Sequence, residues 1–525
     1  MVSLVRQPCD EGVILSKPAD APCPGAQGSW ILAATILASA MAFIDGTVVN
    51  VALPSLQKEL NATVIGVQWV VEAYSLFLSA LLLVGGALGD RYGRKLIFVI
   101  GVTLFALSSA ACGIAQSINQ LIAARAVQGV AGALLIPGSL AIISASFAPD
   151  RRGRAIGTWS GFSAITTAIG PVLGGWLIEH ISWRAVFFLN LPLAAAVVAI
   201  TIRRLPESRD QNQTGRLDWV GAALATIGLA GVVYGLIESS RLGFFQPAVV
   251  APLATGVVSL AAFVVFESRA KNPMLPLKLF RSSDFAGANL LTLMLYAALG
   301  GSMFFLTLNL IQVQGYSATA AGAAFLPFVL IMFLLSRWSG GLVDRFGPRL
   351  PLIIGPLIAT AGLAMFALPG REVSYWTGFF PGVLVLGLGM AISVAPLTTT
   401  VMGSVSEEQA GIASGVNNAV SRAAGLLAIA IFGVVMLQMF GRGLSSRLAV
   451  IDLPETARQA VLAQRIKLAG IELPGDLTTD QQAATRRSIA DSFISGYRLT
   501  MLIAAGLGLA SSASALMFIA RKKVR

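Results

Sequence analysis

The sequence GALGDRYGRK at residues 86–95 lies between two long apolar runs, and a second form of it, GGLVDRFGPR, occupies residues 340–349 between two further apolar runs. Both copies follow the pattern Gly-x-Leu-x-Asp-Arg-aromatic-Gly. Its charges are typical of a short loop between membrane spans, and its small residues allow helices to approach closely. A loop of this kind, present twice in a very hydrophobic chain, indicates a duplicated membrane transporter.

The composition is that of a protein that crosses the bilayer many times. Of its 525 residues, 56% are hydrophobic and 12% are charged, whereas soluble domains carry about 25% charged residues. The apolar runs reach about 20 residues and do not alternate, which favours helices over a β-barrel. The net charge of +12 fits basic cytoplasmic loops, and no contiguous polar segment offers a patch for nucleic acid. The three cysteines suggest neither a disulfide framework nor a metal site.

The apolar runs predict fourteen spans, at residues 30–54, 66–88, 95–116, 119–147, 156–178, 184–202, 218–238, 247–266, 284–312, 320–342, 350–369, 376–402, 410–440 and 495–520. Basic residues gather in alternate short loops, including those at 91–95, 151–154, 203–216, 269–281 and 345–349. The C-terminal tail is also basic. Because cytoplasmic loops carry an excess of Lys and Arg, we expect both termini in the cytoplasm.

The places of the two charged loops predict the domain organisation. The first copy follows the second span and the second follows the tenth, so two bundles of six spans flank two inserted spans. We expect these segments: a cytoplasmic tail at 1–29, a six-helix bundle at 30–204, two inserted spans with linkers at 205–283, a six-helix bundle at 284–520, and a basic cytoplasmic tail at 521–525. A long polar outer loop at 441–494 interrupts the second bundle and receives no function; residues 457–470 within it could form a short amphipathic helix, and an exposed loop is the favoured alternative. Parallel six-helix halves hold their substrate near the bilayer midplane.

Several motifs resemble those of the major facilitator superfamily. Residues 86–95 resemble its motif A, and residues 125–129 are similar to its motif B. Residues 45–54 resemble the first-span motif of the fourteen-span drug:proton antiporters, the EmrB/QacA group. The fifth span is similar to the antiporter motif C at Gly157, Gly170, Pro171, Gly174 and Gly175. The resemblance implies the major facilitator fold: an all-α polytopic membrane protein with two six-helix bundles plus two inserted helices.

The resemblance also implies roles for two of these motifs. A gate on the cytoplasmic side would be formed by the motif A residues Gly86, Asp90, Arg91, Gly93 and Arg94, together with Asp344 and Arg345 of the second copy. A static charge cluster that fixes topology is the alternative. The glycines of motif C would act as a hinge or as a seal against proton leak, and plain close packing of helices is the alternative.

Three ionisable residues, Asp45, Glu72 and Arg125, fall inside predicted spans, where charge is costly and usually functional. At 1.5 Å per residue, all three lie at a similar depth in the outer half of the membrane and could face one cavity. A carboxylate in such a cavity takes up a proton readily, and a nearby arginine opposes this. Movement of Arg125 relative to either carboxylate would therefore load and release a proton.

Each of the three charges also has a structural interpretation. Asp45 could brace the first span through Thr47 or Asn50, Glu72 could lie at the outer water interface, and Arg125 could clamp carbonyl groups between helices. The resemblance implies Asp45 and Arg125 in proton coupling, and an acidic group at position 72 would suit a cationic substrate. The candidates for the substrate cavity are Glu72, Asn50, Gln128, Asn417, Asn418 and Arg422.

These patterns predict a proton-coupled secondary exporter of small amphipathic or cationic compounds that works by alternating access. An exporter or flippase of an endogenous lipid or metabolite is the alternative. The sequence contains no P-loop and no nucleophile–base pattern, so we expect neither an enzyme nor a cofactor, and the proton gradient drives transport. We expect a monomer in a bacterial plasma (inner) membrane whose partners are substrate, protons and lipid. A periplasmic adaptor is left open.

Overall fold

A computed structural model describes residues 25–147, 149–208, 218–270, 273–406 and 409–520. Every regular element within these ranges is helical, which confirms the predicted all-α class. The first half comprises these helices: α2 (Gly25–Glu59), α3 (Val64–Tyr92), α4 (Arg94–Ile114), α5 (Ile118–Ser146), α6 (Pro149–His180), α7 (Trp183–Phe188) and α8 (Asn190–Arg204). Two helices follow it, α9 (Trp219–Leu242) and α10 (Pro247–Arg269).

The second half alternates long helices with short turns of helix. Its first elements are η1 (Leu277–Arg281), α11 (Ser283–Leu308), the π-helical η2 (Asn309–Val313), α12 (Ala318–Ala323), α13 (Leu326–Gly340) and α14 (Leu342–Phe346). They are followed by α15 (Arg349–Met365), α16 (Tyr375–Gly378), α17 (Phe380–Gly403), α18 (Ala410–Leu448), α19 (Glu455–Ala463), η4 (Arg465–Gly470) and α20 (Thr479–Phe518).

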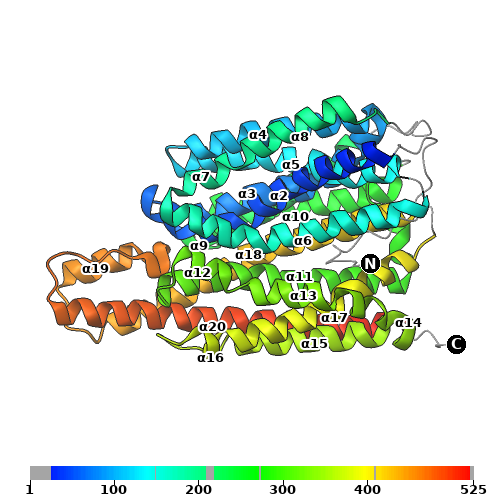
Figure 1. Ribbon diagram of the computed structural model, residues 1–525. Coiled ribbons are helices and arrows are strands. Elements are labelled where there is room, and N and C mark those ends of the chain that lie inside the picture. The colour runs from blue at the N-terminus through cyan, green and yellow to red at the C-terminus, as the bar shows by residue number, and fades with distance from the viewer. Residues whose placement is uncertain (1–24, 148, 209–217, 271–272, 407–408, 521–525) are drawn as a thin grey trace.

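The helices form two layers that lie side by side, with the first half above the second in Figure 1. Within the first half α3 packs on α5 and α2 packs on α6, and within the second α11 packs on α18 and α20. The pair α9 and α10 pack on each other, and α9 also contacts α3 and α18. The α9–α10 pair therefore covers a junction between the two halves.

The two ends of the helical body differ. Helix α2 begins and α20 ends at one end, which we call the terminal end, whereas α19 lies at the other, which we call the α19 end (Figure 1). Both repeated loops lie at the terminal end. Gly93 in the first copy has φ +118° and Gly347 in the second has φ +71°. Only glycine adopts such conformations without strain, so the repeated glycine is required by the same sharp reversal in both halves.

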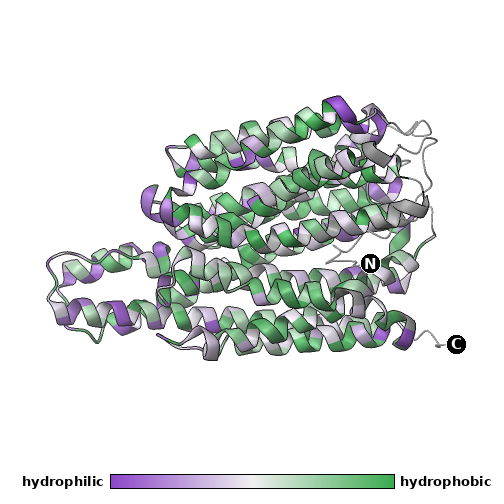
Figure 2. Ribbon diagram, viewed as in Figure 1, coloured by the Kyte–Doolittle hydropathy of each residue, from purple (hydrophilic) through white to green (hydrophobic). Residues whose placement is uncertain are grey.

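Length and composition identify twelve of the described helices as candidate membrane spans. Apolar residues cover the long helices and polar residues concentrate towards the ends of the body (Figure 2). Two predicted spans are not among the twelve: the fifth, which is part of α6, and the eleventh, which is the 17-residue helix α15.

The polar segment at 441–494 is mostly helical: α19 and η4 lie where the sequence allows a short helix, and the ends of α18 and α20 occupy residues expected to be loop. Helix α18 continues to Leu448 and α20 begins at Thr479, so both helices extend past their predicted spans and project at the α19 end (Figure 1). A capping box fixes the start of α20, since the Thr478 side chain accepts from the Gln481 backbone and the Gln481 side chain accepts from the Thr478 backbone. Such reciprocal bonds satisfy two backbone donors at a helix start.

Candidate functional site

The site is built around a buried ion pair between α2 and α5. Asp45 and Arg125 are each 1% exposed, and Arg125 Nη1 donates to Asp45 Oδ2. Arg125 also donates through Nε to the Val70 carbonyl of α3 at 3.1 Å. Its guanidinium lies 4.2 Å from the centre of the Tyr74 ring, within the range of a cation–π contact. The arginine is thus held by one charge, one carbonyl and one aromatic face.

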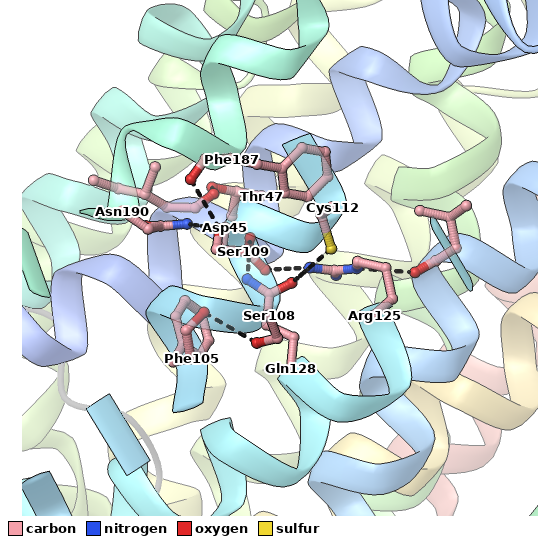
Figure 3. A network of polar contacts seen from close by, with 12 residues as sticks. Asp45, Thr47, Phe105, Ser108, Ser109, Cys112, Arg125, Gln128, Phe187 and Asn190 are labelled. Carbon is pink, nitrogen blue, oxygen red and sulfur yellow. Dashed lines mark hydrogen bonds and ion pairs between the residues drawn. The ribbon is translucent and has the colours of Figure 1, made fainter. Parts of the chain in front are cut away.

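Gln128 joins the two charged residues (Figure 3). Its Oε1 accepts from Arg125 Nη1 at 2.8 Å and its Nε2 donates to Asp45 Oδ1 at 3.0 Å. The Cys112 thiol donates to the same Oε1 at 3.6 Å. Gln128 is fully buried and is part of the charge network. The sequence predicted Gln128 as a cavity residue and did not indicate that it binds both charges.

Glu72 lies apart from this network. Its carboxylate is fully buried, and neither oxygen has a hydrogen-bond partner among the described residues. Val70 and Tyr74, four residues apart, turn towards Arg125, whereas Glu72 shares a face with Gln68, as residues four apart do. Gln68 Nε2 donates to the Ile429 carbonyl of α18 at 2.8 Å. Glu72 therefore faces the second half of the protein.

The other predicted cavity residues occupy two kinds of position. Asn417 is fully buried, and its Nδ2 donates to Asn289 Oδ1 at 3.1 Å and to Thr292 Oγ1 at 2.7 Å, so it ties α18 to α11. Asn50, Asn418 and Arg422 are half-buried. Arg422 lies on α18, a helix of the second half that packs on α3 of the first.

The first charged loop contains an ion pair of its own and is hydrogen-bonded to the C-terminal end of α8. Arg94 Nε and Nη2 both contact Asp90 Oδ1 at 2.8 Å, while Arg91 is exposed near the Tyr92 ring. Lys95 Nζ donates to the Leu205 carbonyl at 2.7 Å.

A further anchor of this loop lies at Glu207. Its carboxylate accepts from the backbone amides of Lys95 and Leu96. In the second copy Arg345 is exposed, and the Asp344 side chain lies outside the described set.

The glycines of α6 sit at two close helix crossings. A Cβ on Gly170 would lie 2.5 Å from Thr47 Oγ1, and one on Gly174 would lie 2.3 Å from Val48 Cγ1, so both face α2. Gly175 faces the other half, where a Cβ would lie 2.5 Å from Thr319 Cα. Pro171 also faces the other half, since its carbonyl contacts Gly322 of α12. Gly157 is at neither crossing and has open space around it.

Sequence comparison identifies the family of this chain. The sequence model of the Major Facilitator Superfamily matches residues 35–429. The chain belongs to this superfamily. It is 33% identical over 504 residues to the tetracenomycin C resistance and export protein of Streptomyces glaucescens, covering 95% of this chain and 93% of that protein. It is 34% identical over 479 residues to the multidrug resistance protein Stp of Mycobacterium tuberculosis, covering 90% and 88%.

Solved structures agree on the fold. A bacterial homolog of the human lysosomal transporter Spinster, in an inward-facing and unoccupied conformation, superposes with a TM-score of 0.64 at 17% identity. The match covers 96% of this chain and 100% of that one. Membership of the superfamily, shown by the sequence match and the relatives, makes the chain a multi-pass membrane transporter of small molecules rather than an enzyme.

Proposed function

We propose that this superfamily member is a proton-coupled exporter of small amphipathic or cationic compounds that works by alternating access. The names of its relatives, which include resistance, export and efflux proteins, support export of drug-like molecules. The single observation that carries the proposal is the buried network of Asp45, Arg125 and Gln128. Charge inside a membrane span is costly and is retained mainly for function.

The network offers a way to couple a proton to movement. When Asp45 carries a proton, its attraction to Arg125 falls, whereas the Val70 carbonyl and the Tyr74 ring still hold the guanidinium on α3. Helix α2 then separates from α5 more easily, and loss of the proton draws them together again. The membrane potential contributes about 2.3 kcal/mol per charge per 100 mV, so neither ATP nor a bound cofactor is needed.

Glu72 supplies the second part of the proposal. An ionised carboxylate without a partner in the protein interior carries a large desolvation cost, which a proton or a cationic substrate compensates. Because Glu72 faces α18 across the junction of the halves, a cation bound there would touch both. This position supports Glu72 as the group that recognises positively charged compounds.

The topology completes the proposal. The twelve candidate spans become fourteen when α6 and α15 are counted, as in the EmrB/QacA group. We propose that the terminal end faces the cytoplasm, because cytoplasmic loops carry an excess of basic residues, and that the protein acts as a monomer in a bacterial plasma membrane. A reporter fused after Arg525 and one inserted at Gly475 test this orientation. Labelling of the second alone by an impermeant reagent applied to intact cells is the expected result, and the reverse pattern contradicts it.

Purified protein in liposomes with an imposed pH gradient tests the function. We expect a permanently cationic dye and a neutral amphipathic dye to move, and each to dissipate the gradient as it moves. Lipid movement without dye transport would instead favour the alternative, an exporter or flippase of an endogenous lipid. Glu238→Gln is the matched control for carboxylate variants, because Glu238 is 8% exposed and paired with Arg241 away from the network.

A further inference from the structure

The 3₁₀ segment η4 bridges the two halves at the α19 end. It contacts α2 and α3 of the first half, and η2, α18 and α20 of the second. It belongs to the polar stretch between α18 and α20, which the proposed function does not use. Segments of this kind usually connect elements over the surface, so its place between the halves calls for an explanation.

Gln57, near the end of α2, is the centre of this contact. It is 6% exposed, and both ends of its amide bind the second half. Its Nε2 donates to the Lys467 carbonyl at 3.0 Å, and its Oε1 accepts from Gln312 Nε2 at 2.9 Å. A third bond runs from Lys467 Nζ to Asn61 Oδ1 at 3.3 Å. Gln312 lies in the π-helical turn η2, a geometry that is frequent at functional positions.

Leu468 adds an observation of a different kind. Its backbone has φ +52° and ψ −129°, a conformation that non-glycine residues adopt only under strain. Its side chain is fully buried in the apolar cluster that also contains Leu56 of the first half and Leu310 of the second. Strain of this sort persists only where the surroundings impose it. The buried Leu468 side chain and the Gln57 bonds impose it here.

We propose that η4, residues 465–470, is a latch that holds the two halves together at the α19 end and must detach before that end can open. Opening of the α19 end breaks the bond between Gln57 of α2 and Gln312 of η2. Detachment also breaks the two bonds that Lys467 of η4 makes with Gln57 and Asn61 and allows the Leu468 backbone to relax. The strain thereby offsets part of the cost of opening and makes the latch reversible. This inference rests on the proposed function only in that alternating access requires the α19 end to open.

Reversible crosslinking tests the latch in the full-length protein. Asn61→Cys and Lys467→Cys are combined after Cys9 and Cys23 are replaced by serine, while the buried Cys112 is kept. A short bis-methanethiosulfonate should stop dye export from proteoliposomes, and a reducing agent should restore it. The control is Gln464→Cys/Glu472→Cys. In the native protein these two residues are hydrogen-bonded to each other within the second half, so a crosslink between the two cysteines should leave export unchanged.

If export continues at the uncrosslinked rate when the cysteines at positions 61 and 467 are joined, the latch is overturned. The proposed function is unaffected by that result. A second measurement is independent of transport. Gln57→Leu should raise the maleimide labelling rate of a cysteine placed at Ala62, which is 2% exposed. We expect about fivefold or more, the factor that one net hydrogen bond contributes to an equilibrium. Gln459→Leu, at an exposed side chain of α19, should have no effect, and equal labelling in the two variants also overturns the latch.

Discussion

Replacing Arg125 with methionine removes the charge that faces Asp45 but keeps a long side chain in its place. In the native protein Asp45 Oδ2 accepts from Arg125 and Oδ1 accepts from Gln128, and both charged residues are 1% exposed. Arg125→Met leaves the carboxylate with the Gln128 amide alone. Removing one member of a buried ion pair costs about 3–5 kcal/mol, so we expect the free energy of unfolding to fall by that amount.

The double variant Asp45→Asn/Arg125→Met isolates the cause. With both charges removed no unpaired charge remains buried, so the double variant should be more stable than Arg125→Met alone. The apparent melting temperature of the purified protein in detergent measures both effects. Arg241→Met is the control, because the Arg241 side chain is 52% exposed in its pair with Glu238, and such pairs contribute at most about 1 kcal/mol. Two results would refute the reasoning: an Arg125→Met protein with the melting temperature of the wild type, or a double variant whose melting temperature is no higher than that of Arg125→Met.

Three further predictions test other parts of the molecule. Glu72→Gln should lower export of a permanently cationic dye by roughly tenfold, equivalent to about 1.4 kcal/mol, while a neutral dye keeps its rate; equal losses for both dyes argue against direct recognition. Gly93→Ala should destabilise the protein by about 1–3 kcal/mol, because φ is +118° and a Cβ would lie 2.7 Å from a carboxylate oxygen. Gly89→Ala, whose nearest neighbour would be 4.0 Å away, should melt like the wild type, and equal melting of both variants would contradict the role of φ. Gly175→Ala should slow export because the new Cβ would lie 2.5 Å from the backbone of α12. Gly157→Ala in the same helix has open space around it and should transport normally. Equal export rates for the two variants would show that transport does not need the close approach of α6 to α12.

The sequence predicted the helical class and the superfamily because long apolar runs and the repeated charged loop are local features. It did not predict the extensions of α18 and α20 at the α19 end, because hydropathy reports contact with lipid and not helix formation. Helices α18 and α20 continue through polar residues once outside the apolar runs. The signal for the start of α20 was nevertheless present, since Thr478 and Gln481 have the spacing of a capping box.

For the candidate site, the sequence indicated the depth of each charged residue in the membrane. It was not used to find the face of its helix on which each residue lies. At a rise of 1.5 Å per residue, Asp45, Glu72 and Arg125 lie at one depth, yet the Glu72 side chain turns away from the other two. The spacing of residues 68 and 72 against that of residues 70 and 74 would have separated the two faces of α3. The Gln57 contacts could not be foreseen, because they join residues more than 250 positions apart.

The most direct test of the account measures proton-driven export by Asp45→Asn in proteoliposomes. The amide keeps an oxygen for Arg125 but cannot take up and release a proton in this range of pH. We predict that dye export driven by an imposed pH gradient is abolished, while dye still exchanges down its own concentration gradient. Full pH-driven export by Asp45→Asn, with the pH dependence of the wild type, would contradict the central claim that this buried carboxylate couples the proton to transport.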